Sequence, residues 1–201
     1  MTRFRAFFYA ALVAATFQTA CNNSDSSGNL SVEQLQKRAD SLNVEMDKSW
    51  AEMMRSDDKK ITHIQWLMSK MDSLGYCHTD SLPSACDTLQ KLYTRLTKER
   101  YTPATMSNSL LIDNYDLRTD SLLDGISHVL EQKPDSLTNP TIKDLYQKIR
   151  QADDSVIYFH SHYDKQVDSY NAFLDFHGET LEKAGYPADR VREKPLFRPV
   201  K

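Results

Sequence analysis

Residues 142–184 read IKDLYQKIRQADDSVIYFHSHYDKQVDSYNAFLDFHGETLEKA, and their apolar side chains recur every three or four positions. This spacing indicates an α-helix with one buried face. One extra interval of four, between Tyr163 and Val167, resembles a stutter that loosens a supercoil. We therefore predict a single helix over 141–184, about 65 Å long at a rise of about 1.5 Å per residue. Its predicted buried positions are Ile142, Leu145, Ile149, Ala152, Val156, Phe159, Tyr163, Val167, Tyr170, Leu174, His177, Leu181 and Ala184.

A helix of this length is not stable alone, so other helices must pack along it. The chain has only five glycines and little alternation of β-branched residues, which leaves no clear strand. Gly75 marks the end of the first predicted helix. The spacing of apolar residues predicts three helices before the long one, over 31–74, 84–100 and 104–132. We predict an all-α fold, an elongated antiparallel four-helix bundle over 31–184, followed by an extended tail over 185–201.

The N-terminal residues have the three parts of a secretory signal: the basic stretch MTRFR, the apolar run AFFYAALVAATF, and small residues before Cys21. The apolar run is shorter than the roughly 20 residues that a membrane-spanning helix needs, so we interpret residues 1–20 as a cleaved signal peptide. Thr19-Ala20-Cys21 resembles a bacterial lipobox, which predicts that Cys21 carries a lipid anchor such as palmitate. Ordinary cleavage near Ala20, leaving a soluble secreted protein, is the alternative. The polar residues that follow Cys21 predict a flexible tether over 21–30.

The charge of the mature chain excludes one class of partner. Cleavage after residue 20 removes Arg3 and Arg5 from the 25 basic residues, which leaves 23 against 28 acidic residues. A nucleic-acid-binding protein usually carries a concentrated basic face. We therefore expect no nucleic-acid partner.

Two further cysteines, Cys77 and Cys86, are separated by HTDSLPSA. In an exported protein, two cysteines across a short loop predict a disulfide. Two free thiols are the alternative, whereas a zinc site does not fit the spacing. Phosphate-binding and dinucleotide-binding fingerprints are also missing from the sequence, so we expect no cofactor.

Histidines and aspartates crowd the middle of the last predicted helix and suggest a metal or acid/base site. Successive helix residues rotate by about 100°, which places His160, Asp164 and Asp168 on one side and His162 almost opposite. The sequence lacks the paired Glu-x-x-His pattern of di-metal bundles and the HExxH zinc motif. We therefore predict a solvated helix face and no catalytic residues, with His160, Asp164 and Asp168 as the candidate ligands if a metal binds. The aromatic side chains nearby predict core packing, with a lateral groove for a partner helix as the alternative.

The last predicted helix contains a recognisable motif from Tyr163 to Asn171, YDKQVDSYN. It is similar to the Tyr-Asn-x-x-Val-x-x-Tyr-Asn signature of the LemA family, with Asp164 in place of the first asparagine. Gly185-Tyr186-Pro187 and Lys194-Pro195-Leu196-Phe197 resemble its closing segment, and Asp47-Lys48-Ser49-Trp50 resembles part of its first helix. The family's Ile-Pro-Asn-Leu element is missing. The resemblance implies an elongated antiparallel helical bundle on a membrane and implies no catalytic residues.

These observations lead to three functional hypotheses. The first is a non-catalytic lipoprotein of the bacterial cell envelope, anchored through Cys21 in the outer membrane or at the cell surface rather than in the inner membrane. It would bind another envelope protein or act as a scaffold. The second is a ligand- or metal-binding bundle, with or without enzymatic activity, that uses His160 and Asp164. The third is a periplasmic holdase-type chaperone, which would need a large exposed apolar patch.

Overall fold

A computed structural model describes residues 30–77, 83–133 and 135–197 of the chain. Every element named below lies within residues 32–201. The predicted signal peptide, Cys21 and all of the predicted tether except Leu30 lie outside the described residues. Within the three described ranges the chain is mostly helical and contains no strand, which confirms the all-α prediction.

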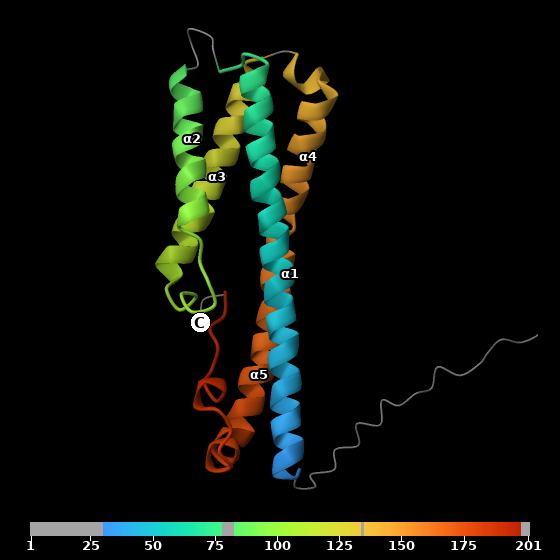
Figure 1. The fold of residues 1–201 in the computed structure, drawn as a ribbon, viewed down its shortest axis with the longest axis vertical. Helices are drawn as coiled ribbons and strands as arrows, with labels where there is room; N and C mark the ends of the chain where they lie inside the picture. The colour runs from blue at the N-terminus through green and yellow to red at the C-terminus, as the bar shows by residue number, and fades with distance from the viewer. Residues whose placement is uncertain (1–29, 78–82, 134, 198–201) are drawn as a thin grey trace, which may run out of the picture. The chain divides into compact units, whose positions relative to one another are not determined.

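Five α-helices follow one another: α1 (Val32–Ser73), α2 (Pro83–Lys98), α3 (Ser109–Glu131), α4 (Pro140–Asp154) and α5 (Val156–Lys183) (Figure 1). The predicted first helix is confirmed, and it ends as expected. Gly75 adopts a left-handed conformation with φ of 71°. The Tyr76 amide donates to the Met71 carbonyl and the Gly75 amide donates to the Asp72 carbonyl. These two bonds form a Schellman motif, which satisfies carbonyl groups at the helix end.

Two predicted helix boundaries were wrong. The predicted helix over 141–184 is two helices, because α4 ends at Asp154 and α5 begins at Val156, with Ser155 between them. Asp153, Asp154 and Ser155 are weak helix formers, so a break costs least there. The helix predicted from residue 104 begins only at Ser109, because residues 103–107 form turns.

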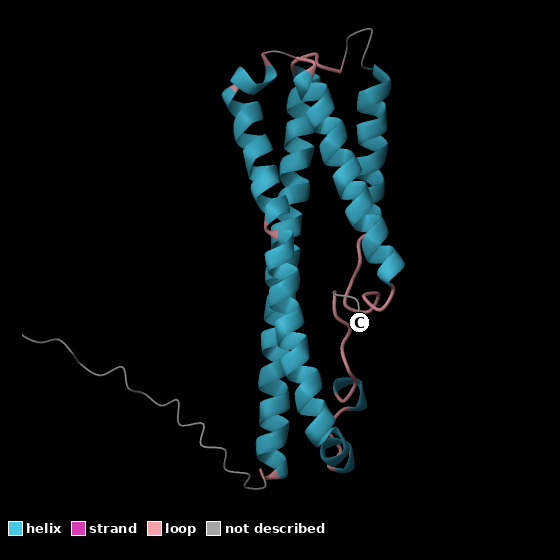
Figure 2. Cartoon of the chain, turned by 180° about the vertical axis from the view of Figure 1, so that it is seen from behind, coloured by secondary structure: helices cyan, strands magenta, loops and turns pink. Residues whose placement is uncertain are grey.

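α1 is the element against which the others are arranged. It packs against α4 along one part of its length and against α5 along another, and α2 packs against α3 (Figure 2). Gly125 of α3 faces α2 so closely that an added Cβ would lie 2.6 Å from Leu89 Cδ2. One core joins α1 to α2, α3 and α4. Its fully buried side chains include Ile64, Leu67, Leu96, Leu122, Ile126, Ile142 and Ile149.

A second core joins α1 to α5 and to the residues after α5. Gly185, with φ of 76°, ends α5 by the same pair of bonds that ends α1. The chain then turns back and runs toward the connection between α2 and α3 (Figures 1 and 2). We call described residues 186–197 the tail. The buried members of this core are Leu35, Ala39, Leu42, Tyr170, Leu174, Leu181 and Tyr186.

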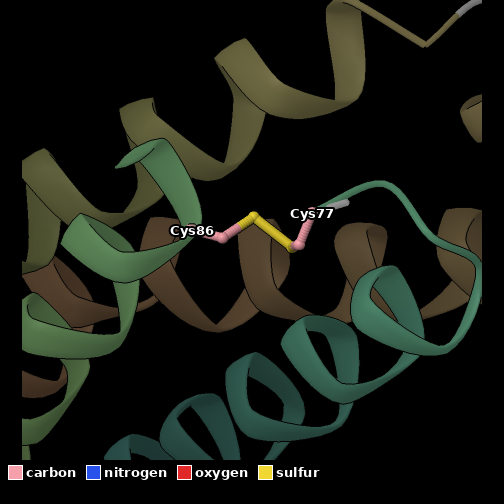
Figure 3. The surroundings of a disulfide bond; sticks show 2 residues. All are labelled: Cys77 and Cys86. Atoms are coloured by element: carbon pink, nitrogen blue, oxygen red, sulfur yellow. A yellow bond between two sulfur atoms is a disulfide. The ribbon is translucent and has the colours of Figure 1, made fainter. Parts of the chain in front are cut away.

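Cys77 and Cys86 form a disulfide, with 5.7 Å between their Cα atoms (Figure 3). Cys77 lies just after the end of α1, and Cys86 lies in the first turn of α2. The bond therefore ties the end of α1 to the start of α2, and the prediction of a disulfide is confirmed in this structure.

Candidate functional site

The face of α5 that the sequence marks as a possible reaction site holds the tail. The Asn171 side chain makes two hydrogen bonds to the main chain of Lys194: Nδ2 donates to the carbonyl oxygen at 2.9 Å, and Oδ1 accepts from the amide at 2.9 Å. A side-chain amide used in this way imitates the main-chain pairing of a β-strand. Asn171 therefore binds the backbone of residue 194, and these two bonds do not depend on which side chain that residue carries.

A second main-chain bond lies one helical heptad away. Asp164 Oδ1 accepts a hydrogen bond from the Phe197 amide at 2.8 Å. Seven helical residues separate Asp164 from Asn171, a rise of about 10 Å, and three extended residues from Lys194 to Phe197 span about 10 Å. The distance along α5 between Asp164 and Asn171 thus matches the distance along the tail between Phe197 and Lys194. The tail runs in the opposite direction to α5.

Aromatic rings enclose the end of the tail. The Phe197 ring stacks on His160 with a centroid distance of 3.8 Å, and it lies nearly parallel to Trp50 at 6.3 Å. Tyr101 and Tyr163 meet the same ring edge to face, each with a centroid distance of 5.6 Å. We call His160, Trp50, Tyr101 and Tyr163 the aromatic cage. It draws its members from α1, α5 and the connection between α2 and α3.

Burial in the cage changes the acid/base chemistry of its members. Desolvation lowers the pKa of His160 to about 4, although the charge of Asp164 opposes the shift. A neutral imidazole at pH 7 can accept a hydrogen bond, and the Tyr101 hydroxyl lies 3.3 Å from His160 Nε2. Burial also raises the pKa of Tyr163 to about 12. His160 is therefore held neutral and serves as a stacking surface.

The start of the tail is fixed to both long helices. The Tyr170 hydroxyl donates to the Arg190 carbonyl. Tyr186 and Arg190 both donate to Asp40 Oδ1 of α1, at 2.7 and 3.0 Å. Burial and the bond to Asp40 raise the pKa of Tyr186 to about 12. The tail is thus held at several points over its described length.

The structure brings the predicted candidates His160, Asp164 and Asp168 together at one open hollow beside Phe197. The expectation of a solvated face is wrong for two of them, because His160 is half-buried beneath Phe197 and Asp164 is only 6% exposed. His162 lies apart from them and stacks near Tyr158. Among the described residues, no group of three or more His, Cys, Asp or Glu side chains is arranged to hold a metal ion.

Sequence analysis missed a cluster of buried charges in the middle of α1. Lys60 is 3% exposed, and its Nζ atom lies 3.6 Å from Asp57 Oδ1 and 3.5 Å from Asp153 Oδ1 of α4. Asp57 Oδ2 also accepts from Arg100 Nη2 at 2.7 Å and from the Tyr115 hydroxyl at 2.6 Å. Asp57 is therefore the centre of a network that joins α1 to the α2–α3 connection and to α3.

This polar cluster leaves little free space. A cavity of about 20 Å³ lies between Asp57, Lys60, Tyr115 and the cage residues Tyr101 and His160. That volume accommodates about one water molecule. Burial and the neighbouring Asp57 carboxylate raise the pKa of Tyr115 well above its usual range, so its hydroxyl remains a donor. The cluster has room for hydration but not for an organic substrate.

One sequence signal could have identified the cluster. The buried stripe of α1 continues from Met53 to Ile64 at spacings of four, three and four, and the two positions between them are Asp57 and Lys60. Two ionisable residues on the apolar stripe of a helix require partners, because an unpaired buried charge is very costly. The partners Arg100 and Asp153 lie far away in the sequence, so their roles are visible only in the structure.

No protein family, curated protein or solved structure matched this chain in the comparisons made. None of the helices in the described ranges combines the length and apolarity needed to cross a bilayer. A functional proposal for this chain therefore depends on the contacts seen in the structure. The polar groups of α5 bind main chain, and the charges of the polar cluster bind one another.

Proposed function

We propose that this chain is a lipid-anchored protein of the bacterial cell envelope that works as a non-catalytic protein-binding or scaffolding module. One observation carries the proposal: Asp164, one of the candidate metal ligands, and Asn171 of the same helix hydrogen-bond the main chain of an extended segment. Main-chain bonds with a pocket for one side chain are the means by which many domains bind peptides.

The proposed architecture is an elongated antiparallel helical bundle of the LemA type. The length of α1 supports it. The tail also supports it, because the tail forms hydrogen bonds to both α1 and α5. The five residues at the defined positions of the similar motif each have structural contacts. Tyr163 belongs to the aromatic cage, Val167 and Tyr170 are buried, and Asp164 and Asn171 hold the tail.

The proposed anchor is a lipid on Cys21, which follows from the basic, apolar and small-residue segments that precede it. Outer-membrane or cell-surface attachment is part of the proposal. The anchor would keep the bundle near other envelope proteins and so raise their effective concentration.

Capture of partners from membranes tests the proposal. The full chain, with Cys21 intact, is cross-linked in membranes and purified, and the bound proteins are identified by mass spectrometry. We expect one or a few envelope proteins to be enriched over a matched control membrane protein, with the enrichment reduced by Cys21→Ala. Enrichment of no protein over the control in repeated captures contradicts the proposal.

Metal analysis separates this function from a metal-dependent one. We expect substoichiometric metal in the purified full chain. One equivalent of a metal ion, lost in both His160→Ala and Asp164→Ala, would contradict a purely protein-binding role and assign a metal site to this face.

A further inference from the structure

The contacts of the tail with α5 separate into contacts that any segment can make and contacts that select a residue. At position 194 the helix recognises only the main chain, because the Lys194 Nζ atom turns away to the Asp189 carbonyl oxygen. At position 197 it recognises both the amide, through Asp164, and the ring, through the aromatic cage. The half-buried Leu196 packs against the small core of Met46, Met106, Tyr163 and Val167.

The α5 face thus specifies a short extended segment with an apolar residue followed by an aromatic residue. At the position of Lys194, two residues before the apolar one, any residue with a free main-chain amide and carbonyl is sufficient. The residue at the position of Phe197 must also have a main-chain N–H, because Asp164 accepts a hydrogen bond from it.

Charge adds a further preference. The α5 helix carries five acidic and two basic residues, namely Asp164, Asp168, Asp175, Glu179, Glu182, Lys165 and Lys183. Residues 185–201 carry five basic and two acidic residues, namely Arg190, Arg192, Lys194, Arg198, Lys201, Asp189 and Glu193. An acidic helix therefore holds a basic segment, and a competing segment with basic flanks would share this complementarity.

We propose that the α5 face and the aromatic cage form a peptide-recognition site that binds, in trans, an extended basic segment of a partner protein ending in an apolar-aromatic pair. Residues 194–197 occupy this site in cis when the partner is not bound. The inference rests on the proposed function and names the recognition element of that function.

The linkage of the tail to α5 sets the conditions for exchange. A segment tethered by a few residues has an effective concentration in the millimolar range. A free peptide competes poorly with such a segment, whereas a partner held on the same membrane competes well. Loosening the tail should therefore increase the affinity for a peptide added in trans.

Two full-chain variants loosen the tail in different ways. Phe197→Ala empties the aromatic cage. Lys194→Pro keeps the Phe197 ring but removes the amide that donates to Asn171. The probe is a fluorescent peptide with the sequence of residues 190–201, RVREKPLFRPVK, and its binding is measured by fluorescence anisotropy.

We expect saturable binding of one peptide to each variant, at least about tenfold tighter than to the unmodified chain, which is a difference of about 1.4 kcal/mol. Adding Asn171→Ala to either variant should weaken binding about tenfold or more. The matched control is Asn108→Ala, because Asn108 is exposed and makes no side-chain capping bond at the start of α3. A peptide in which Phe197 is replaced by alanine should not bind detectably.

Three results overturn the inference. The first is no peptide binding by either loosened variant when thermal melting shows that at least one remains folded. The second is binding that Asn171→Ala leaves unchanged, which would place the peptide elsewhere. The third is a dimer of the unmodified chain in sedimentation velocity that Asn171→Ala dissociates, since the trans occupant would then be the tail of a second copy. Partner capture from membranes can still succeed in each case, so failure here is distinct from failure of the proposed function.

Discussion

Removal of the Asp57 carboxylate should destabilise the protein more than removal of any single apolar methylene in its core. Asp57 is 12% exposed and contacts Lys60, Arg100 and Tyr115. Asp57→Ala leaves the Lys60 ammonium, which is 3% exposed, with the 3.5 Å contact to Asp153 as its one ion pair among the described residues. Breaking a buried pair from one side typically costs about 3 to 5 kcal/mol, since the remaining charge stays desolvated.

The complementary substitution should be far milder. Lys60→Met fills the same space with an apolar side chain, and it leaves Asp57 bound to Arg100 and Tyr115. Asp153 is 23% exposed and can turn to water. Removal of one partner of a buried pair is costly only when the other charge is left uncompensated, and here Asp57 keeps Arg100, so we expect a change within about 1 kcal/mol.

Urea denaturation followed by circular dichroism measures both free energies of unfolding, and thermal melting provides a second readout. For a chain of this size about 1 kcal/mol shifts Tm by roughly 2 to 4 °C, so Asp57→Ala should lower Tm by roughly 6 to 20 °C. Lys183→Ala is the matched control, because its pair with Glu179 is exposed and worth less than about 1 kcal/mol. Equal losses for Asp57→Ala and Lys60→Met, or a loss below about 1 kcal/mol for Asp57→Ala, would refute the reasoning.

Three further predictions concern single features. The pKa of His160 is about 4 in the folded chain, against 6.5 when unperturbed, so the unfolded state binds the proton more readily and acid destabilises the fold as pH falls through this window. Lowering the pH from 7.5 to 5.5 should therefore reduce the free energy of unfolding by about 1.3 kcal/mol more in the unmodified chain than in His160→Gln. His128→Gln is the control. Reduction of the Cys77–Cys86 disulfide, or its double replacement by serine, should lower the free energy of unfolding by about 2 to 3 kcal/mol, measured in urea. Cys21→Ala should move the protein from the membrane pellet to the soluble fraction in cell fractionation, and an unchanged distribution would contradict lipid anchoring.

Much of the helical structure could be predicted from the sequence, because the spacing of apolar side chains is a local property. The helix ends were predicted where a residue with special backbone chemistry marks them, as Gly75 does. The break at Ser155 could not be predicted, since Ala152, Val156 and Phe159 continue the spacing across it. A helix break that keeps the same residues on the buried face does not alter the spacing of apolar residues in the sequence.

The position of the candidate face could be predicted from the sequence, but its contacts could not. Rotation around the helix placed His160, Asp164 and Asp168 on one side, and the structure gathers them at one hollow. His160 and Asp164 contact Phe197 of the tail, and helical periodicity contains no information on where a later segment of the chain returns. The polar cluster was missed for a related reason. Asp57 and Lys60 lie on the apolar stripe of α1, but their partners Arg100 and Asp153 are distant in the sequence, so the network itself could not be predicted.

The tail and the polar cluster are parts of one arrangement, because Tyr101 and His160 contact both of them. Tyr101 and His160 line the cavity beside Lys60, and both rings also contact Phe197. The Tyr101 ring further contacts Tyr115, whose hydroxyl binds Asp57. A water-filled path to the charges would weaken their attraction, since ion pairs are strong only where the dielectric constant is low. Phe197 covers His160 and Tyr101, so we expect it to limit the access of bulk water to that side of the cluster. We therefore expect the tail, through Phe197, to stabilise the charges at the centre of the fold as well.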